Sequence, residues 1–158
     1  MKIKLTTILL FCLLLISCSS VSGYKYNEEA AKIYFEESEA FEALYSNLSD
    51  GTYDGDQVQL KEDIENLELV TKETMGKIDS LTPPEDAEQF HAKIQEYIKS
   101  VDADFIKELN TYADLSDGQQ RDSVLGVICE LYSDISDVEN EMQKEQAKFA
   151  KKIGLKLE

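Results

Sequence analysis

Apolar side chains recur at steps of three and four over four long stretches of this chain, and this spacing constrains the fold more than any other feature. Such a repeat gives an α-helix one apolar face, whereas a strand would alternate with a period of two. Only 7 Gly and 2 Pro occur among the 158 residues, so little interrupts the stretches. Hydrophobic residues make up 42%, enough for one domain with a core. The sequence therefore predicts an all-α fold.

The four stretches predict four helices joined by short connections. The first two span about Glu28–Leu48 and Gln57–Ser80, the third begins at a proline pair, and the fourth ends near Gly154. Short connections make consecutive helices antiparallel neighbours. We therefore expect an up-down-up-down antiparallel four-helix bundle over residues 27–158, after a signal peptide.

Capping residues mark where these helices begin and end. The predicted starts are Asn27 for the first helix, Asp54 or Asp56 for the second, the capping box Thr82-Pro83-Pro84-Glu85 for the third, and the capping box Ser116-Asp117-Gly118-Gln119 for the fourth. The two prolines would lie in the first turn of the third helix, where no backbone N–H is needed. Gly51 is predicted to end the first helix, and Gly154, after Lys151 and Lys152, the fourth.

The apolar faces of the four helices form the predicted core. They comprise Ala30, Ile33, Tyr34, Phe41, Leu44, Tyr45 and Leu48; Leu60, Ile64, Leu67, Thr71, Met75 or Thr74, Ile78 and Leu81; Ala87, His91, Ile94, Ile98, Val101, Phe105 and Leu109 or Tyr112; and Val124, Ile128, Leu131, Ile135, Val138, Met142, Phe149 and Ile153. Glu37 also falls on the first face. It is either buried there or an edge residue whose carboxylate reaches solvent.

The N-terminal segment has the pattern of an export signal. Lys2 and Lys4 precede an apolar run from Leu5 to Ile16, which is shorter than the ~20 residues that span a bilayer. The run ends in Leu15-Ile16-Ser17-Cys18, which resembles the lipobox of bacterial lipoproteins. The alternatives are an ordinary signal peptide with a chance cysteine, or an uncleaved anchor helix.

The lipobox resemblance implies that residues 1–17 are cleaved and that Cys18 carries a diacylglyceryl group and an N-acyl chain. Residues 18–26 would then be the lipidated cysteine and a short tether. Ser19 follows the cysteine, and in such lipoproteins this resembles the signal for the outer membrane. The expected location is therefore the cell envelope, with the protein held on the membrane by acyl chains.

The remaining cysteine has no partner. Cys12 lies in the predicted signal and Cys18 is taken by lipid, so Cys129 alone remains and no internal disulfide can form. A buried, small, hydrophobic Cys129 is the commoner case, ahead of an intermolecular disulfide or a nucleophile.

The charge of the chain excludes some partners. The formal net charge is −16, and without the two signal lysines 14 basic residues face 32 acidic ones, a net charge of −18. Such a surface repels nucleic acid, and an electrostatically steered partner would be cationic. The commoner explanation of acidic helices is simply solubility.

Two motifs are candidates for metal sites. Glu88-x-x-His91 is half of a di-iron motif, but the chain has one His in total, so a hydrogen-bonded core or groove residue is expected instead. The Asp50–Asp56 loop matches part of an EF-hand, yet its twelfth position is Lys61, where calcium needs a bidentate Glu. A turn that caps the next helix explains the same residues, while weak calcium binding stays open.

No catalytic constellation appears in the sequence. It lacks a haem-attachment motif, a Gly-rich phosphate loop and a Gly-x-Ser-x-Gly elbow. We therefore expect no enzyme activity, no catalytic residues and no cofactor or metal site.

A second likeness covers most of the predicted bundle. Lys25-Tyr26-Asn27, and Leu81-Thr82-Pro83-Pro84 leading to Phe90-His91, resemble uncharacterised helical surface lipoproteins of Gram-negative bacteria. Together these features predict a non-enzymatic, lipid-anchored envelope protein that binds another envelope protein or supports an assembly; an immunity-type lipoprotein that binds a basic toxin is one form. The alternative is a periplasmic module that binds a small ligand or metal near His91 or the 50–56 loop. The oligomeric state is left open.

Overall fold

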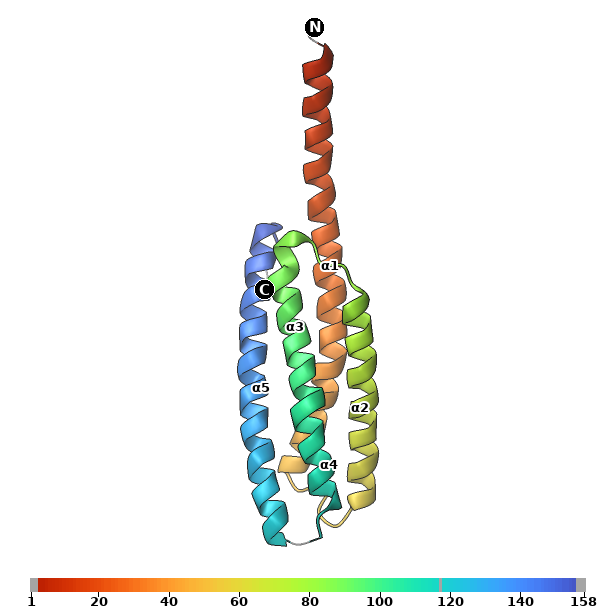
Figure 1. Cartoon of the computed structure of the whole chain (residues 1–158), viewed down its shortest axis with the longest axis vertical. Helices are drawn as coiled ribbons and strands as arrows, with labels where there is room; N and C mark the ends of the chain where they lie inside the picture. The colour runs from red at the N-terminus through yellow and green to blue at the C-terminus, as the bar shows by residue number, and fades with distance from the viewer. Residues whose placement is uncertain (1–2, 117, 156–158) are drawn as a thin grey trace.

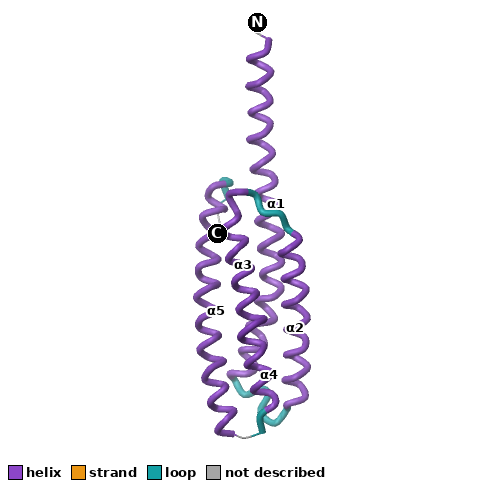
Figure 2. The backbone as a smooth tube through the Cα atoms, in the orientation of Figure 1, coloured by secondary structure: helices purple, strands orange, loops and turns teal. Residues whose placement is uncertain are grey.

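The computed structural model describes the backbone of residues 3–116 and 118–155, and the side chains of residue 22 onward within these ranges. The described residues form four long helical arms that lie side by side, with no strand among them (Figures 1 and 2). The arms are α1 (Ile3–Ser49); α2 (Gln57–Ser80); α3 (Glu88–Ser100), continued by the π-helical turn η2 (Val101–Phe105) and by α4 (Ile106–Asp114); and α5 (Gly118–Lys152). A 3-10 turn, η1 (Glu85–Ala87), precedes α3. The predicted all-α helical bundle is confirmed.

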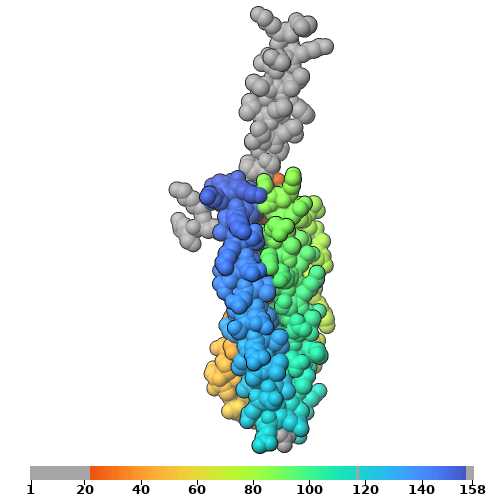
Figure 3. Space-filling model, turned by 60° about the vertical axis from the view of Figure 1, so that its left-hand side comes forward, coloured from red at the N-terminus to blue at the C-terminus, as the bar shows by residue number. Residues whose placement is uncertain are grey.

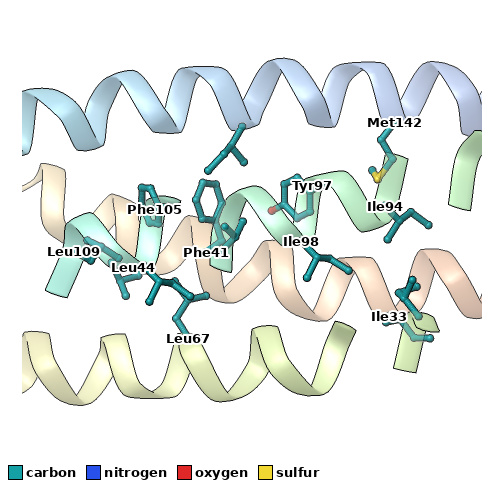
Figure 4. Close-up of a cluster of buried hydrophobic side chains, with 14 of the residues drawn as sticks. Ile33, Phe41, Leu44, Leu67, Ile94, Tyr97, Ile98, Phe105, Leu109 and Met142 are labelled. Atoms are coloured by element: carbon teal, nitrogen blue, oxygen red, sulfur yellow. The ribbon is translucent and has the colours of Figure 1, made fainter. Parts of the chain in front are cut away.

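The core runs along the axis between the arms, and Figure 4 shows its central part. Its centre is aromatic: the ring of Phe41 on α1 lies 6.2 Å from Tyr97, 4.7 Å from Phe105 and 5.6 Å from Tyr132, measured between ring centroids. Burial of one such side chain stabilises the fold by roughly 1.5–3 kcal/mol, and each aromatic pair by about 0.5–1.5 kcal/mol more. These contacts join α1 to the third arm and to α5.

On the third arm the predicted face is confirmed except at His91. Phe90 and Tyr97 are buried, while His91 is only half-buried. The turn η2 holds one more residue than an α-helical turn and so rotates the next part of the arm about its axis. Leu109 and Tyr112, the two alternatives predicted after Phe105, are both buried. On α2 the predicted helix bounds are confirmed. Of the two alternatives predicted for its face, Thr74 is buried and Met75 is not.

The predicted start of the first helix is wrong, because α1 already includes Asn27 and the segment assigned to a tether. The apolar face simply continues towards the N-terminus. A Cβ on Gly23 would come within 2.9 Å of Ile153, so the glycine lets α1 approach the end of α5 closely. Tyr26 is buried and packs edge-on against Phe90 and Phe149. Residues 22–26 thus belong to the bundle.

The capping box predicted at Thr82 is also wrong. Pro84 is extended, with ψ of 155°, and no side chain caps η1, which begins at Glu85. A residue before proline is driven into the extended region, so Thr82 and Pro83 cannot be helical and the prolines precede the helix. The second predicted box includes residue 117, which lies outside the described residues.

Three other helix ends are confirmed. Asp56 caps α2, since its Oδ1 accepts a hydrogen bond of 3.0 Å from the backbone N–H of Gln59. Gly51 and Gly154 have φ of +80° and +77°, the left-handed conformation that ends α1 and α5. Among the residues whose side chains are described, no helix is long and apolar enough to cross a membrane.

Two helix-interior glycines give a direct test of the helical arms. A Cβ on Gly76 in α2 or on Gly126 in α5 would meet no atom within 4 Å. We expect Gly76→Ala and Gly126→Ala each to raise the free energy of unfolding by about 1 kcal/mol, because alanine has the higher helix propensity. Urea unfolding followed by circular dichroism measures this. Gly51→Ala is the control and should lower it, since φ is positive there.

Candidate functional site

Glu37 lies in the middle of the bundle, on the core-facing side of α1. Its side chain is 0% exposed. Of the two alternatives predicted for it, burial or an edge position that reaches solvent, burial is therefore correct. Its neighbours along that face, Ile33 and Phe41, are buried hydrophobic residues. A carboxyl group in such a setting is the most unusual chemical feature of this core.

Two hydroxyl groups from other arms are buried in the same region. Thr71 comes from α2 and Tyr97 from α3, and Figure 4 shows Tyr97 between Phe41 and Ile94. Both carboxyl oxygens of Glu37, the Thr71 Oγ1 and the Tyr97 hydroxyl are buried without a hydrogen-bond partner among the described residues. We call Glu37, Thr71 and Tyr97 the core polar cluster.

Burial dominates the electrostatics of this cluster. The pKa of Glu37 is raised to about 8, chiefly by burial; the Thr71 hydroxyl opposes this rise and the Asp102 carboxylate adds to it. Burial, together with the charge of Glu37, also raises the pKa of the Tyr97 hydroxyl. Near neutral pH the cluster therefore consists of a carboxylic acid and two neutral hydroxyls.

Tyr34 connects the cluster to α5. Its ring packs edge-on against Tyr97, with 5.3 Å between centroids, and its hydroxyl donates a hydrogen bond to the carboxylate of Glu139. Burial and this hydrogen bond both raise the pKa of Tyr34. The turn η2 carries Asp102, which is exposed and whose charge acts on Glu37. Carboxylates thus face the cluster from α5 and from η2.

The cluster is closed to large molecules. Figure 3 shows side chains of α3 and α5 packed together over one face of the bundle. Surface hollows of about 240 and 500 Å³ are lined by other residues, such as Ile33 and Lys77 in one and Gln95 and Lys99 in another. The carboxyl oxygens of Glu37 are buried from solvent, so a ligand reaches them only if side chains rearrange.

His91 is hydrogen-bonded, as expected, but lies at the margin of the core. Its Nδ1 and the Tyr26 hydroxyl share a hydrogen bond of 2.8 Å. Burial lowers the pKa of His91, while the charge of Asp79 raises it. Glu88, the other half of the motif, is exposed. His91 thus joins the start of the third arm to α1.

The Asp50–Asp56 loop forms turns and a helix cap. Asp50 Oδ1 accepts a hydrogen bond from the backbone N–H of Thr52, and Asp56 is the cap of α2. Lys61, at the twelfth position of the EF-hand count, forms an ion pair of 2.7 Å with Asp114. Within the described residues, no group of three or more His, Cys, Asp or Glu side chains is placed to hold a metal ion.

Cys129 is exposed, so its predicted burial is wrong. The buried position on this turn of α5 is its neighbour Ile128. Cys129 lies beside Tyr45, whose ring stacks on Tyr132 with 3.6 Å between centroids. The backbone of Cys18 belongs to α1, and its side chain lies outside the described residues.

The predicted apolar faces include Glu37 and Thr71, whereas Tyr97 is expected only at or beside the face of the third helix, with its ring packed in the core. The signal for a position on that face was present, because Phe90, Ile94, Tyr97 and Val101 follow the same three- and four-residue steps. No protein family, curated protein or solved structure matches this chain.

The orphaned hydroxyl of Tyr97 leads to a test of the cluster. We expect Tyr97→Phe to raise the free energy of unfolding by about 1 kcal/mol, because it removes a buried polar group that lacks a partner. Tyr26→Phe is the matched control and should lower the same quantity by about 1 kcal/mol, since it breaks the bond to His91. Chemical denaturation measures both. A loss of stability in Tyr97→Phe would mean that its hydroxyl is hydrogen-bonded in solution.

Proposed function

We propose that this chain is a lipid-anchored, non-enzymatic protein of the cell envelope whose helical bundle binds another envelope protein. Residues 1–17 are removed on export, and acyl chains on Cys18 hold the protein, most simply at the outer membrane. The observation that carries this proposal is the sequence Leu15-Ile16-Ser17-Cys18 directly after a short apolar run. Two or more acyl chains hold a protein firmly on a bilayer, whereas one holds it only marginally.

The continuity of α1 supports an anchor that sets the position of the bundle. One helix includes Cys18 and the first residues that pack in the core, Gly23 and Tyr26. At a rise of about 1.5 Å per residue, Cys18 is only ~10 Å from these contacts. The bundle end formed by Pro83, Pro84 and Ile153 would then lie close to the membrane.

We infer the up-down-up-down antiparallel topology for the same bundle. Three ion pairs between arms support it: Lys77 with Glu36, Lys61 with Asp114, and Lys152 with Asp86. In the last two pairs a residue at the end of one arm faces a residue near the start of the other, and in the first the end of α2 faces a residue well before the end of α1. Figure 1 agrees, because the 50–56 connection lies at one end of the bundle and the 81–84 connection at the other.

The charge of the proposed mature chain is unevenly distributed along the bundle. We define the anchor half as residues 18–36, 71–98 and 139–158, and the far half as residues 37–70 and 99–138. The anchor half has 10 basic and 13 acidic residues, a net charge of −3, and the far half has 4 basic and 19 acidic ones, a net charge of −15. The half that points away from the membrane thus carries most of the charge.

This distribution favours a cationic protein partner at the far half. A strongly acidic surface attracts a basic partner and raises its association rate, especially at low salt. The same half exposes three hydrophobic side chains, Val58, Leu69 and Val127, that can add apolar contact. A basic toxin or a basic segment of an envelope assembly has the required chemistry.

The anchor is tested by replacing its attachment residue. We expect Cys18→Ala to abolish incorporation of labelled fatty acid and to leave an unprocessed precursor or a soluble protein, because the acylated thiol is lost. Cys129→Ala is the matched control and should incorporate label like the wild type. Absence of label from the wild-type protein would contradict the proposal.

Partner binding is tested by charge reversal in each half. Glu62 and Glu65 in the far half, and Glu28 and Glu88 in the anchor half, are exposed and form no ion pair within the described residues. We expect the Glu62→Lys/Glu65→Lys double variant to lose crosslinks to its partner in cells, and the Glu28→Lys/Glu88→Lys variant to keep them. Equal crosslinking by both variants would exclude the far half as the docking surface.

A further inference from the structure

Neither anchoring nor partner binding uses the core polar cluster. We propose that Glu37 is a proton-binding switch: the folded core holds its carboxyl group protonated, and loss of this proton loosens the middle of α1 from α2 and α3. This inference stands independently of the proposed function.

The absence of a counter-charge is the first argument. Glu37 is 0% exposed, and no Lys, Arg or His among the described residues forms an ion pair with it. An unpaired carboxylate in an apolar interior costs far more free energy than a neutral acid, so such a group keeps its proton instead. Its neighbour Glu36 provides the contrast, since it is exposed and pairs with Lys77 at 2.7 Å.

The groups that face Glu37 from each packed element are neutral hydroxyls or carboxylates. α2 contributes Thr71 and α3 contributes Tyr97. Tyr34 comes from α1 itself and is hydrogen-bonded to Glu139 of α5, while η2 contributes Asp102. Of these groups, only the Thr71 hydroxyl favours a negative charge on Glu37, and the carboxyl oxygens have no hydrogen-bond partner in the folded core. The nearby Asp102 carboxylate repels it.

The direction of the pH effect is set by these contacts. An unfolded Glu loses its proton near pH 4.3, whereas burial raises the pKa of Glu37 in the folded chain to about 8. The stabilising contribution of the protonated group is thus complete below the unfolded pKa and is lost as the pH rises towards the folded pKa. Between these two pKa values folding takes up one proton, and the unfolding equilibrium constant rises by up to about tenfold per pH unit.

The structure also indicates where the loosening occurs. The first part of the described bundle is fixed by the contacts of Tyr26 with Phe90 and Phe149, and the far part by the stacking of Tyr45 on Tyr132. Glu37 lies between these two aromatic contacts on α1. Hydration of its carboxylate therefore requires the middle of α1 to move away from Thr71 and Tyr97, and this movement also loosens the edge-on contacts of Tyr34 and Phe41 with Tyr97.

The experiment compares Glu37→Gln with Glu36→Gln. Both remove one carboxylate from adjacent positions, but only Glu37 is buried. Stability is measured by denaturant unfolding from about pH 5 to about pH 8. We expect the stability of Glu36→Gln to fall with rising pH as that of the wild type does. In Glu37→Gln the unfolding equilibrium constant should rise less steeply, by up to about tenfold less per pH unit. An identical decline in all three proteins would overturn the proposal.

Two measurements on the wild-type chain test the proposal even if Glu37→Gln does not fold. Carbon-13 NMR of the side-chain carboxyls should show one that titrates near pH 8 and that belongs to Glu37. Hydrogen exchange should show amides of residues 34–41 becoming less protected above that pH, relative to amides around Tyr26. Titration of every carboxyl in the ordinary range, or unchanged relative protection, would refute the switch.

Discussion

The aromatic contact of Phe41 with Tyr97, Phe105 and Tyr132 is the interaction on which the rest of this bundle depends. One ring on α1 touches the third arm at two points and α5 at a third. Because the four arms have no strand or disulfide to join them in the described residues, side-chain packing along the axis is the force that holds them together. The ion pairs between arms contribute little, since in three of the four among the described residues both partners are well exposed.

Glu37 lies one helical turn before Phe41, and its burial lowers the stability that this aromatic contact provides. Its burial replaces a hydrophobic side chain by a polar one at the point where four arms converge, and its oxygens find no donor among the described residues. Buried polar groups without partners are rare in native cores and call for an explanation in each case. Retention of a proton is the explanation that the surrounding carboxylates and hydroxyls favour, because it removes the charge that burial penalises.

The outer surface is characterised by an uneven distribution of charge. Its acidic residues concentrate in the half that lies away from the proposed anchor, while lysines are more frequent in the anchor half. Self-repulsion within the far half destabilises the fold to some degree, but it keeps the bundle soluble and attracts positive charge. An anchor at one end and a charged surface at the other would together fix which part of the molecule meets a partner.

The sequence by itself determined the helical class, the bounds of α2, the glycine ends of α1 and α5, and the position of Glu37 on an apolar face. These result from local rules, because side-chain spacing, capping and positive φ depend only on near neighbours. Tertiary structure decided the extension of α1 through Tyr26, the π-helical turn η2 and the exposure of Cys129. Each of these depends on which surface of another arm is available for packing, and a helical repeat does not contain that information.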